Sequence, residues 1–120
     1  MESTIHITQE EIQHNSYYKE NPCNFLELIE TVKKHKNIKT VLMCKRKKTL
    51  RDWIISSTPL LNDPVYDILT RSYWIVNDIK DWSDARVICP ECKKPFIGKN
   101  IYRLRLGYSK RCSIDCMNKS

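Results

Sequence analysis

Four cysteines near the C-terminal end of the sequence have the residue type and the spacing to hold a metal ion. Cys89 and Cys92 are separated by two residues, and Cys112 and Cys116 are separated by three. A structural zinc site needs four such ligands within about 2.3 Å of one point, and a C-x-x-C turn presents two thiolates to one ion. Pro90 suits that tight turn, and sulfurs four residues apart lie on one face of a helical turn. The spacing therefore predicts a structural Zn²⁺ bound by all four cysteines, with no position left for a catalytic water.

The competing interpretations of these cysteines are free thiols or two disulfides. The expected cellular compartment argues against both. The acidic N-terminal segment MESTIHITQEE lacks the basic-then-apolar order of a signal peptide, so we expect a cytoplasmic protein whose thiols stay reduced. No apolar run approaches the length of a membrane helix, so no membrane partner is expected. A metal would also supply folding free energy that a segment of about thirty residues lacks.

The residues between the cysteine pairs alternate between apolar and basic types. Ile101 to Tyr108 has the period of a strand, which would place Arg103 and Arg105 on an outward face with Ile101 and turn Leu104 inward. A first pair on a turn, then a hairpin, then a second pair at a helix start is the order of a treble-clef finger. A zinc ribbon, with both pairs on turns, is the alternative.

Positive charge is concentrated in the same segment. The chain has a formal net charge of +7, and residues 89–120 carry eight Lys/Arg against two Asp/Glu, or +6, which four thiolates and one zinc ion would reduce to about +4. Residues 1–40 sum to −1 and residues 41–88 to +2. Arginine forks and lysine charges attract phosphate oxygens. The cations predicted to contact nucleic acid are Lys99, Arg103, Arg105, Lys110 and Arg111.

Two alternative interpretations of the basic segment remain beside nucleic-acid binding. A basic strand face can be a solvated face, and small zinc modules also serve protein contacts. The second basic run, Lys45 to Lys48, is typical of a wet loop, although it could extend a phosphate-binding surface. Cys23 and Cys44 have no nearby cysteine and are expected to be buried free thiols. The three histidines, His6, His14 and His35, are expected at the surface.

The rest of the chain is predicted to be helical. Both glycines of the chain fall inside the cysteine-rich segment, and apolar residues recur at helical spacing in three or four stretches between residues 9 and 82. The first helix is expected to run to about Tyr18, and the apolar run 39–44 could be a strand or a helix start. The residues expected to open the helices are Thr8, Asn24, Thr49 and Asp63. The predicted fold is thus α+β, with a helical body at 1–84 and a zinc module at 85–120.

Residues 58–118 carry a further pattern. A helical stretch of the form T-x-L-x-N followed by R-x-Y-W-I-x-N leads into C-x-x-C, and G-Y-x-x-x-C-S-x-x-C closes the segment. The matching residues are Thr58, Leu60, Asn62, Arg71, Tyr73 to Ile75, Asn77, Cys89, Cys92, Gly107, Tyr108, Cys112, Ser113 and Cys116. This half of the chain resembles the zinc-finger region of large-phage proteins related to homing and very-short-patch-repair-type endonucleases.

The resemblance implies that the finger binds DNA in company with a nuclease domain that follows it. No acidic cluster for magnesium, His-Asn-His constellation or lysine-flanked catalytic acid follows the finger in this sequence, so nuclease activity is not expected of it. We expect a phage-type DNA-binding protein in the host cytoplasm, a stand-alone or shortened relative of an endonuclease and not itself an enzyme. The alternative is a zinc-stabilised adapter that docks on another protein.

Overall fold

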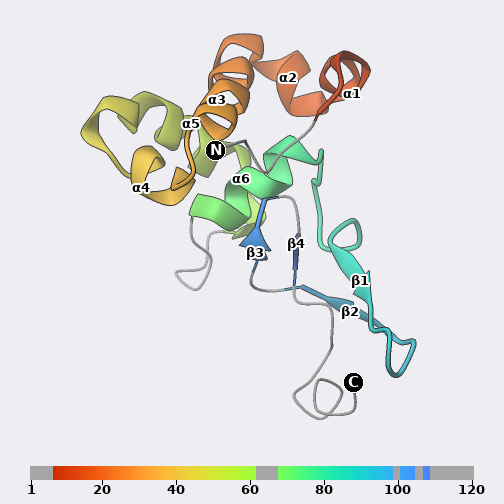
Figure 1. Cartoon of the computed structure of the whole chain (residues 1–120). Coiled ribbons are helices and arrows are strands. Elements are labelled where there is room, and N and C mark those ends of the chain that lie inside the picture. The colour runs from red at the N-terminus through yellow and green to blue at the C-terminus, as the bar shows by residue number, and fades with distance from the viewer. Residues whose placement is uncertain (1–6, 62–67, 99–100, 105–106, 109–120) are drawn as a thin grey trace.

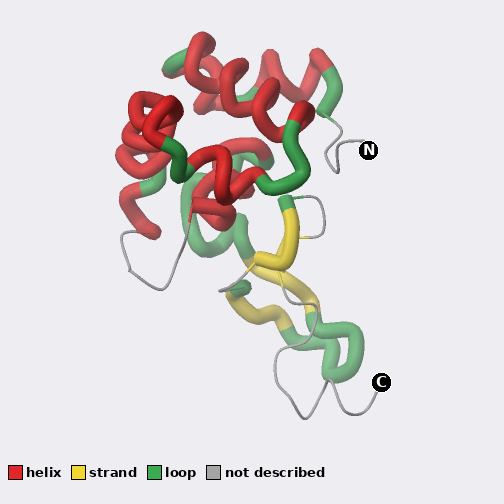
Figure 2. Tube along the Cα trace, turned by 60° about the vertical axis from the view of Figure 1, so that its left-hand side comes forward, coloured by secondary structure: helices red, strands yellow, loops and turns green. Residues whose placement is uncertain are grey.

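A computed structural model describes residues 7–61, 68–98, 101–104 and 107–108 of the chain. The chain is mostly helical and carries two short antiparallel hairpins, which confirms the α+β class in its broad sense. The helices are α1 (Gln9–His14), α2 (Ser16–Glu20), α3 (Pro22–Lys34), α4 (Ile38–Leu42), α5 (Lys48–Ser57) and α6 (Ile68–Val76), with 3-10 turns η1 (Lys45–Lys47) and η2 (Pro59–Leu61). The strands are β1 (Arg86–Ile88), β2 (Pro95–Ile97), β3 (Ile101–Arg103) and β4 (Gly107–Tyr108). The helices gather into one body, and the β1–β2 hairpin extends away from it (Figures 1 and 2).

The first helix begins as predicted and ends early. Thr8 caps α1 by accepting a hydrogen bond from the backbone N–H of Glu11 (3.1 Å). The helix stops before Asn15, and not near Tyr18, because Asn15 is buried and its side chain serves two other partners. The side-chain Oδ1 accepts from the backbone N–H of Tyr18 (3.3 Å) as the cap of α2, and Nδ2 donates to the carbonyl of Ile75 (2.8 Å) in α6.

The cap of α3 lies three residues before the predicted one. Asn21 caps the helix by accepting from the backbone N–H of Asn24 (3.1 Å), and Pro22 occupies the first position, where its missing N–H costs no hydrogen bond. The apolar stripe of this helix is confirmed. Its buried members are Phe25, Leu28, Ile29 and Val32.

The apolar run 39–44 lies mostly in a helix, α4. The basic run after it, which was expected to be a solvated loop, has helical structure instead. The first three residues of the run 45–48 form η1 and the fourth begins α5. Thr49 is therefore not the cap of that helix, and Lys47, which holds the cap position, makes no side-chain capping hydrogen bond. The prediction of a helix start at Asp63 lies outside the described residues.

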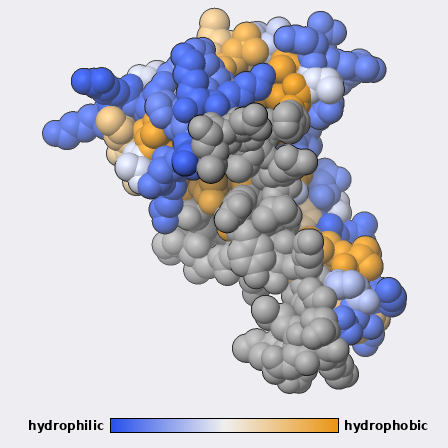
Figure 3. Space-filling model, in the orientation of Figure 1, coloured by the Kyte–Doolittle hydropathy of each residue, from blue (hydrophilic) through white to orange (hydrophobic). Residues whose placement is uncertain are grey.

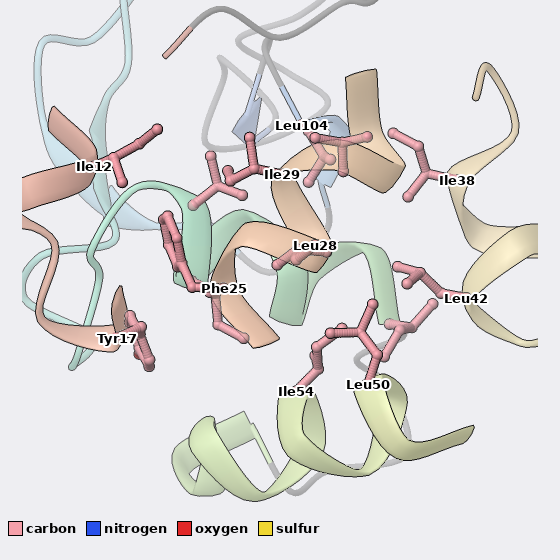
Figure 4. Close-up of a cluster of buried hydrophobic side chains, with 14 residues drawn as sticks. Ile12, Tyr17, Phe25, Leu28, Ile29, Ile38, Leu42, Leu50, Ile54 and Leu104 are labelled. Carbon is pink, nitrogen blue, oxygen red and sulfur yellow. The ribbon is translucent and has the colours of Figure 1, made fainter. Parts of the chain in front are cut away.

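Most buried apolar side chains belong to one cluster at the centre of the helical body, which is drawn in Figure 4. It consists of Ile12, Tyr17, Phe25, Leu28, Ile29, Val32, Ile38, Leu42, Leu50, Ile54, Ile68, Ile75, Val76 and Leu104. Among the described residues, Leu104 is the member that the C-terminal segment contributes, and β3 packs against α6. A second cluster joins Trp74 to Ile79 and Ala85, with the rings of Trp74 and Trp82 meeting edge to face at 5.2 Å. Trp74 is buried, and Trp53 and Trp82 are partly buried and pack against the main and the second cluster respectively.

The predicted single strand from Ile101 to Tyr108 is wrong. β3 ends at Arg103, and β4 runs back beside it with Ile101 opposite Tyr108. Ile101 packs against both apolar clusters, and does not face outward as the continuous strand required. Leu104, in the turn, is buried as predicted. An alternation of apolar and polar residues is compatible with one long strand or with a hairpin. The chain adopts the arrangement that buries more apolar surface against α6.

The N-terminal helices are fastened to the end of α6. Asp78 has a left-handed backbone (φ 57°), and the backbone N–H of Ile79 donates to the carbonyl of Trp74 (2.8 Å), as in a Schellman cap. The Asp78 carboxylate accepts from both the backbone N–H (3.1 Å) and the hydroxyl (2.5 Å) of Ser16. Tyr17 donates its hydroxyl hydrogen to the Ile79 carbonyl (2.5 Å). Segments about sixty residues apart in the chain thus hold one another.

Candidate metal centre and basic surfaces

The first cysteine pair lies in the turn that joins β1 to β2. These strands pair antiparallel with Ile88 opposite Pro95, so the loop between them is closed at its base. Inside the loop, the backbone N–H of Cys89 donates to the carbonyl of Lys94 (3.1 Å), and the backbone N–H of Lys93 donates to the carbonyl of Cys89 (2.8 Å). Lys93 adopts a left-handed backbone (φ 64°) directly after Cys92. The chain therefore turns sharply around the two cysteines.

The two side chains of this pair differ in exposure. Cys89 is fully buried, whereas Cys92 is exposed. Thiolate sulfurs are the ligands that structural zinc prefers, and two from one tight turn make half of a tetrahedral set. The residues present thus fit half of the predicted site. The other half, Cys112 and Cys116, lies outside the described residues, within which no group of three or more His, Cys, Asp or Glu side chains could hold a metal.

The predicted nucleic-acid contacts fall almost entirely beyond what is described. Arg103 lies in β3, where its backbone partner is Gly107. The remaining four are Lys99, Arg105, Lys110 and Arg111, which lie outside the described residues. These contacts stay predictions.

Other side chains singled out by type lie at the surface. His14 and His35 are exposed, as predicted, while His6 is outside the described residues. Cys23 and Cys44 are free thiols, but both are exposed, so the prediction that they are buried is wrong. Each lies at the start of a helical turn, where neither side chain reaches the core.

A denser basic stretch lies in the helical body. Residues 33–51 contain nine Lys/Arg and no Asp/Glu. It covers the end of α3, all of α4, η1 and the first turn of α5. The charge sums over residues 1–40 and 41–88 divide this stretch between them and average it with acidic residues, so neither sum shows it. The net charge summed over windows of about twenty residues does show it.

Several of these cations have internal partners. Lys47 Nζ lies 3.1 Å from Glu27 Oε2, and Lys34 Nζ lies 2.5 Å from Glu30 Oε1. The hydrogen bond and charge of Lys34 lower the pKa of the Glu30 carboxyl. Arg51 donates from one nitrogen to the carbonyls of Leu42 (3.1 Å) and Cys44 (3.2 Å). The Lys47 contact joins η1 to α3, and the Arg51 contacts join α5 to the end of α4, whereas the Lys34 pair lies within α3.

An open groove of about 420 Å³ lies on another side of the body, where α2, the end of α5 and the end of α6 meet. Lys80 Nζ lies 3.7 Å above the Tyr17 ring and 3.4 Å from Glu20 at this groove. The Lys80 ammonium therefore has both a carboxylate and an aromatic face as partners. These contacts hold Lys80 against α2 at the edge of the groove.

Comparison of the chain with family models, with curated proteins and with solved structures gave no match. Within the described ranges, none of the helices has the length and apolar character to cross a membrane.

Proposed function

We propose that the protein is a zinc-containing nucleic-acid-binding protein, with DNA as its ligand, and that Cys89, Cys92, Cys112 and Cys116 hold a structural Zn²⁺. The observation that carries the proposal is the turn at Cys89: the chain closes on itself through two backbone hydrogen bonds, and Lys93 takes the left-handed conformation after the second cysteine. This brings the first ligand pair onto one short loop. When bound, the ion would supply folding free energy to the C-terminal segment.

The basic character of the segment supports nucleic acid as the ligand. The net charge of residues 89–120 is +6 before metal binding, and polyanions are attracted to such a concentration of charge. Lys99, Arg103, Arg105, Lys110 and Arg111 are the proposed phosphate contacts. The activity is binding and not catalysis, and it fits the resemblance to the finger of phage endonucleases, of which this chain would be an accessory relative in the host cytoplasm.

Metal content tests the first half of the proposal. Purified protein analysed by elemental mass spectrometry should contain about one zinc per chain, and Cys89→Ser or Cys116→Ser should abolish it. Cys23→Ser and Cys44→Ser are matched controls, because these exposed thiols belong to no cysteine pair, and both should retain the metal. Equal metal loss in all four variants, or a protein whose tail is folded without metal, would contradict the site.

Salt-dependent binding tests the second half. Each phosphate contact contributes a slope of about −0.9 to the logarithm of affinity against the logarithm of salt concentration on duplex DNA. Fluorescence anisotropy with a labelled duplex should therefore show affinity that falls steeply with salt and weakens in Arg103→Ala/Arg105→Ala. Binding that is insensitive to salt, or no binding to duplex or single strands, refutes nucleic-acid recognition by the module.

One observation favours the adapter as a second candidate. On one face of the β1–β2 hairpin, Ile88 is 60 % exposed and Ile97 is 42 % exposed, and exposed Pro95 lies opposite Ile88. Figure 3 shows the apolar atoms of this hairpin. Exposed apolar groups of this kind mark protein contacts. Ile88→Ser/Ile97→Ser should abolish capture of a protein partner if the adapter is correct, and leave DNA binding unchanged if the module acts on DNA.

A further inference from the structure

Three cations at the junction of η1 and α5 face solvent. Lys45, Arg46 and Lys48 are exposed, and within the described part of the chain no carboxylate forms a salt bridge with any of them. Lys47, the remaining cation of the run, turns to Glu27 of α3. We call Lys45, Arg46 and Lys48 the basic turn. Hydrophilic side chains project from the edge of the molecule where α4 leads into α5 (Figures 1 and 3).

The backbone that carries the basic turn is anchored on both sides. Before it, the carbonyl of Cys44 accepts from the guanidinium of Arg51 (3.2 Å) and from the backbone N–H of Lys47 (3.1 Å). After it, α5 is fixed by Leu50 and Ile54, which are 1 % and 0 % exposed in the main core cluster. Three cationic side chains are thus carried on an ordered stretch of backbone, so little backbone order has to be gained when a ligand binds.

Helix stability does not account for this charge. Cations at the start of a helix oppose its dipole, and α5 has no acidic residue in its first turn and no side-chain cap. Lys45 and Lys48 lie three residues apart, where side chains are neighbours, and their repulsion adds to the cost. An anionic partner would offset both effects.

We propose that the basic turn is a second phosphate-binding surface, on the helical body, that contacts the backbone of the same nucleic acid as the zinc module. The choice of nucleic acid rests on the proposed function; the cation surface rests on the contacts above. A bilayer surface fits less well, because interfacial helices bury an apolar face in the lipid. The apolar face of α5 is instead turned into the core through Leu50 and Ile54, and exposed Asp52 lies on the same helix.

The ligand should be read without sequence selectivity. Contacts from lysine and arginine to phosphate oxygens fix the position of a protein on a duplex and carry no sequence information directly. The basic turn would then add affinity and salt dependence to a bound duplex. It would not change which sequence is preferred.

The experiment compares variants of the full chain on a labelled duplex of about 20 base pairs at about 50 to 300 mM salt. At 0.1 M salt each phosphate contact is worth about 0.9 logarithmic units, or about eightfold in affinity. Lys45→Gln/Arg46→Gln/Lys48→Gln should therefore weaken binding by about eightfold per lost contact and make the salt slope shallower by about 0.9 for each. Lys45→Arg/Arg46→Lys/Lys48→Arg keeps the charge and should bind like the wild type.

A second arm separates this proposal from the function of the module. Arg103→Gln/Arg105→Gln removes module charge and leaves the basic turn intact. If the module variant loses affinity and the Lys45→Gln/Arg46→Gln/Lys48→Gln variant does not, the module function stands and the basic turn is overturned. If only the basic-turn variant loses affinity, the basic turn stands and the module function fails.

Two further outcomes are decisive. Circular dichroism and urea unfolding should show that the glutamine triple variant folds and is at least as stable as the wild type, since the three cations oppose the dipole of α5. Loss of DNA binding with an intact fold supports the proposal. Binding of the wild type to phosphatidylserine vesicles through the basic turn, with unchanged duplex affinity in the triple variant, overturns it in favour of a membrane surface.

Discussion

Arg71 of α6 is expected to be the most sensitive single position for stability. It is only 7 % exposed. One guanidinium nitrogen donates to the carbonyl of Thr58 (3.0 Å), its hydroxyl (3.0 Å) and the carbonyl of Ile55 (3.4 Å), and the other donates to the carbonyl of Leu61. Among the described residues all its acceptors are neutral oxygens at the end of α5 and in η2. The cation therefore complements the negative end of the α5 dipole.

The size of the effect follows from the acceptors left behind. Burial lowers the pKa of Arg71, but arginine remains protonated in proteins. Arg71→Met keeps most of the apolar stem and removes every donor. The carbonyl of Leu61 then stays buried without this partner, which costs about 1–3 kcal/mol, whereas the carbonyl of Thr58 keeps the backbone N–H of Leu61 (3.0 Å) and loses about 1 kcal/mol. The two together give a loss of about 3 kcal/mol, which for a chain of this size corresponds to a fall in Tm of roughly 12 °C.

Urea unfolding followed by tryptophan fluorescence measures this loss directly. Arg71→Lys should lose about half as much, because one ammonium group cannot reproduce the planar fork that reaches several carbonyls. Arg46→Met is the matched control, since Arg46 is exposed and its change should stay within about 0.5 kcal/mol. A free energy of unfolding for Arg71→Met within about 0.5 kcal/mol of the wild type refutes the reasoning.

Two more predictions concern the contacts that fasten the N-terminal helices to α6. Asn15→Asp keeps the cap of α2, because aspartate caps helices as well as asparagine does, but it removes the amide that donates to the α6 carbonyls. A carboxylate facing those carbonyls should cost about 3 kcal/mol of stability. An unchanged urea midpoint would show that this contact does not stabilise the fold. Burial, with the charges of Asp78 and Glu20, raises the pKa of Tyr17 above its ordinary value. Because an unfolded tyrosine titrates at about 10, the unfolded state loses its proton first, and stability should be retained below that pH and decline above it. Tyr17→Phe should lose about 1 kcal/mol with the hydrogen bond to Ile79 and show a shallower decline at high pH; equal slopes for both proteins would contradict the assignment.

Local signals predicted part of the fold correctly. The cap at Thr8 and the buried stripe from Phe25 to Val32 depend on residues within one or two turns of each other, so their spacing along the chain is sufficient. The early end of α1 could not be found in this way. The helix ends at Asn15 because its side-chain amide donates to carbonyls about sixty residues away in the sequence. No residue near Asn15 predicts these partners.

The candidate site divides in the same manner. The C-x-x-C pair predicted a tight turn, and Cys89 and Cys92 lie in one. The reversal of the chain between β3 and β4 was missed, because the same alternation of residues suits a continuous strand. The zinc ligand set and the module's phosphate contacts stay predictions.

The amino-acid order alone determined that four thiols come in two close pairs and that cations gather in two stretches, because both are counts along the chain. Only the tertiary structure decided which cations are neutralised. Lys47 meets Glu27 across twenty residues, while Lys45, Arg46 and Lys48 beside it do not meet a carboxylate in the described structure. Whether a charge is paired depends on which groups folding brings within a few ångströms of it. That distance cannot be predicted from the neighbouring residues in the sequence.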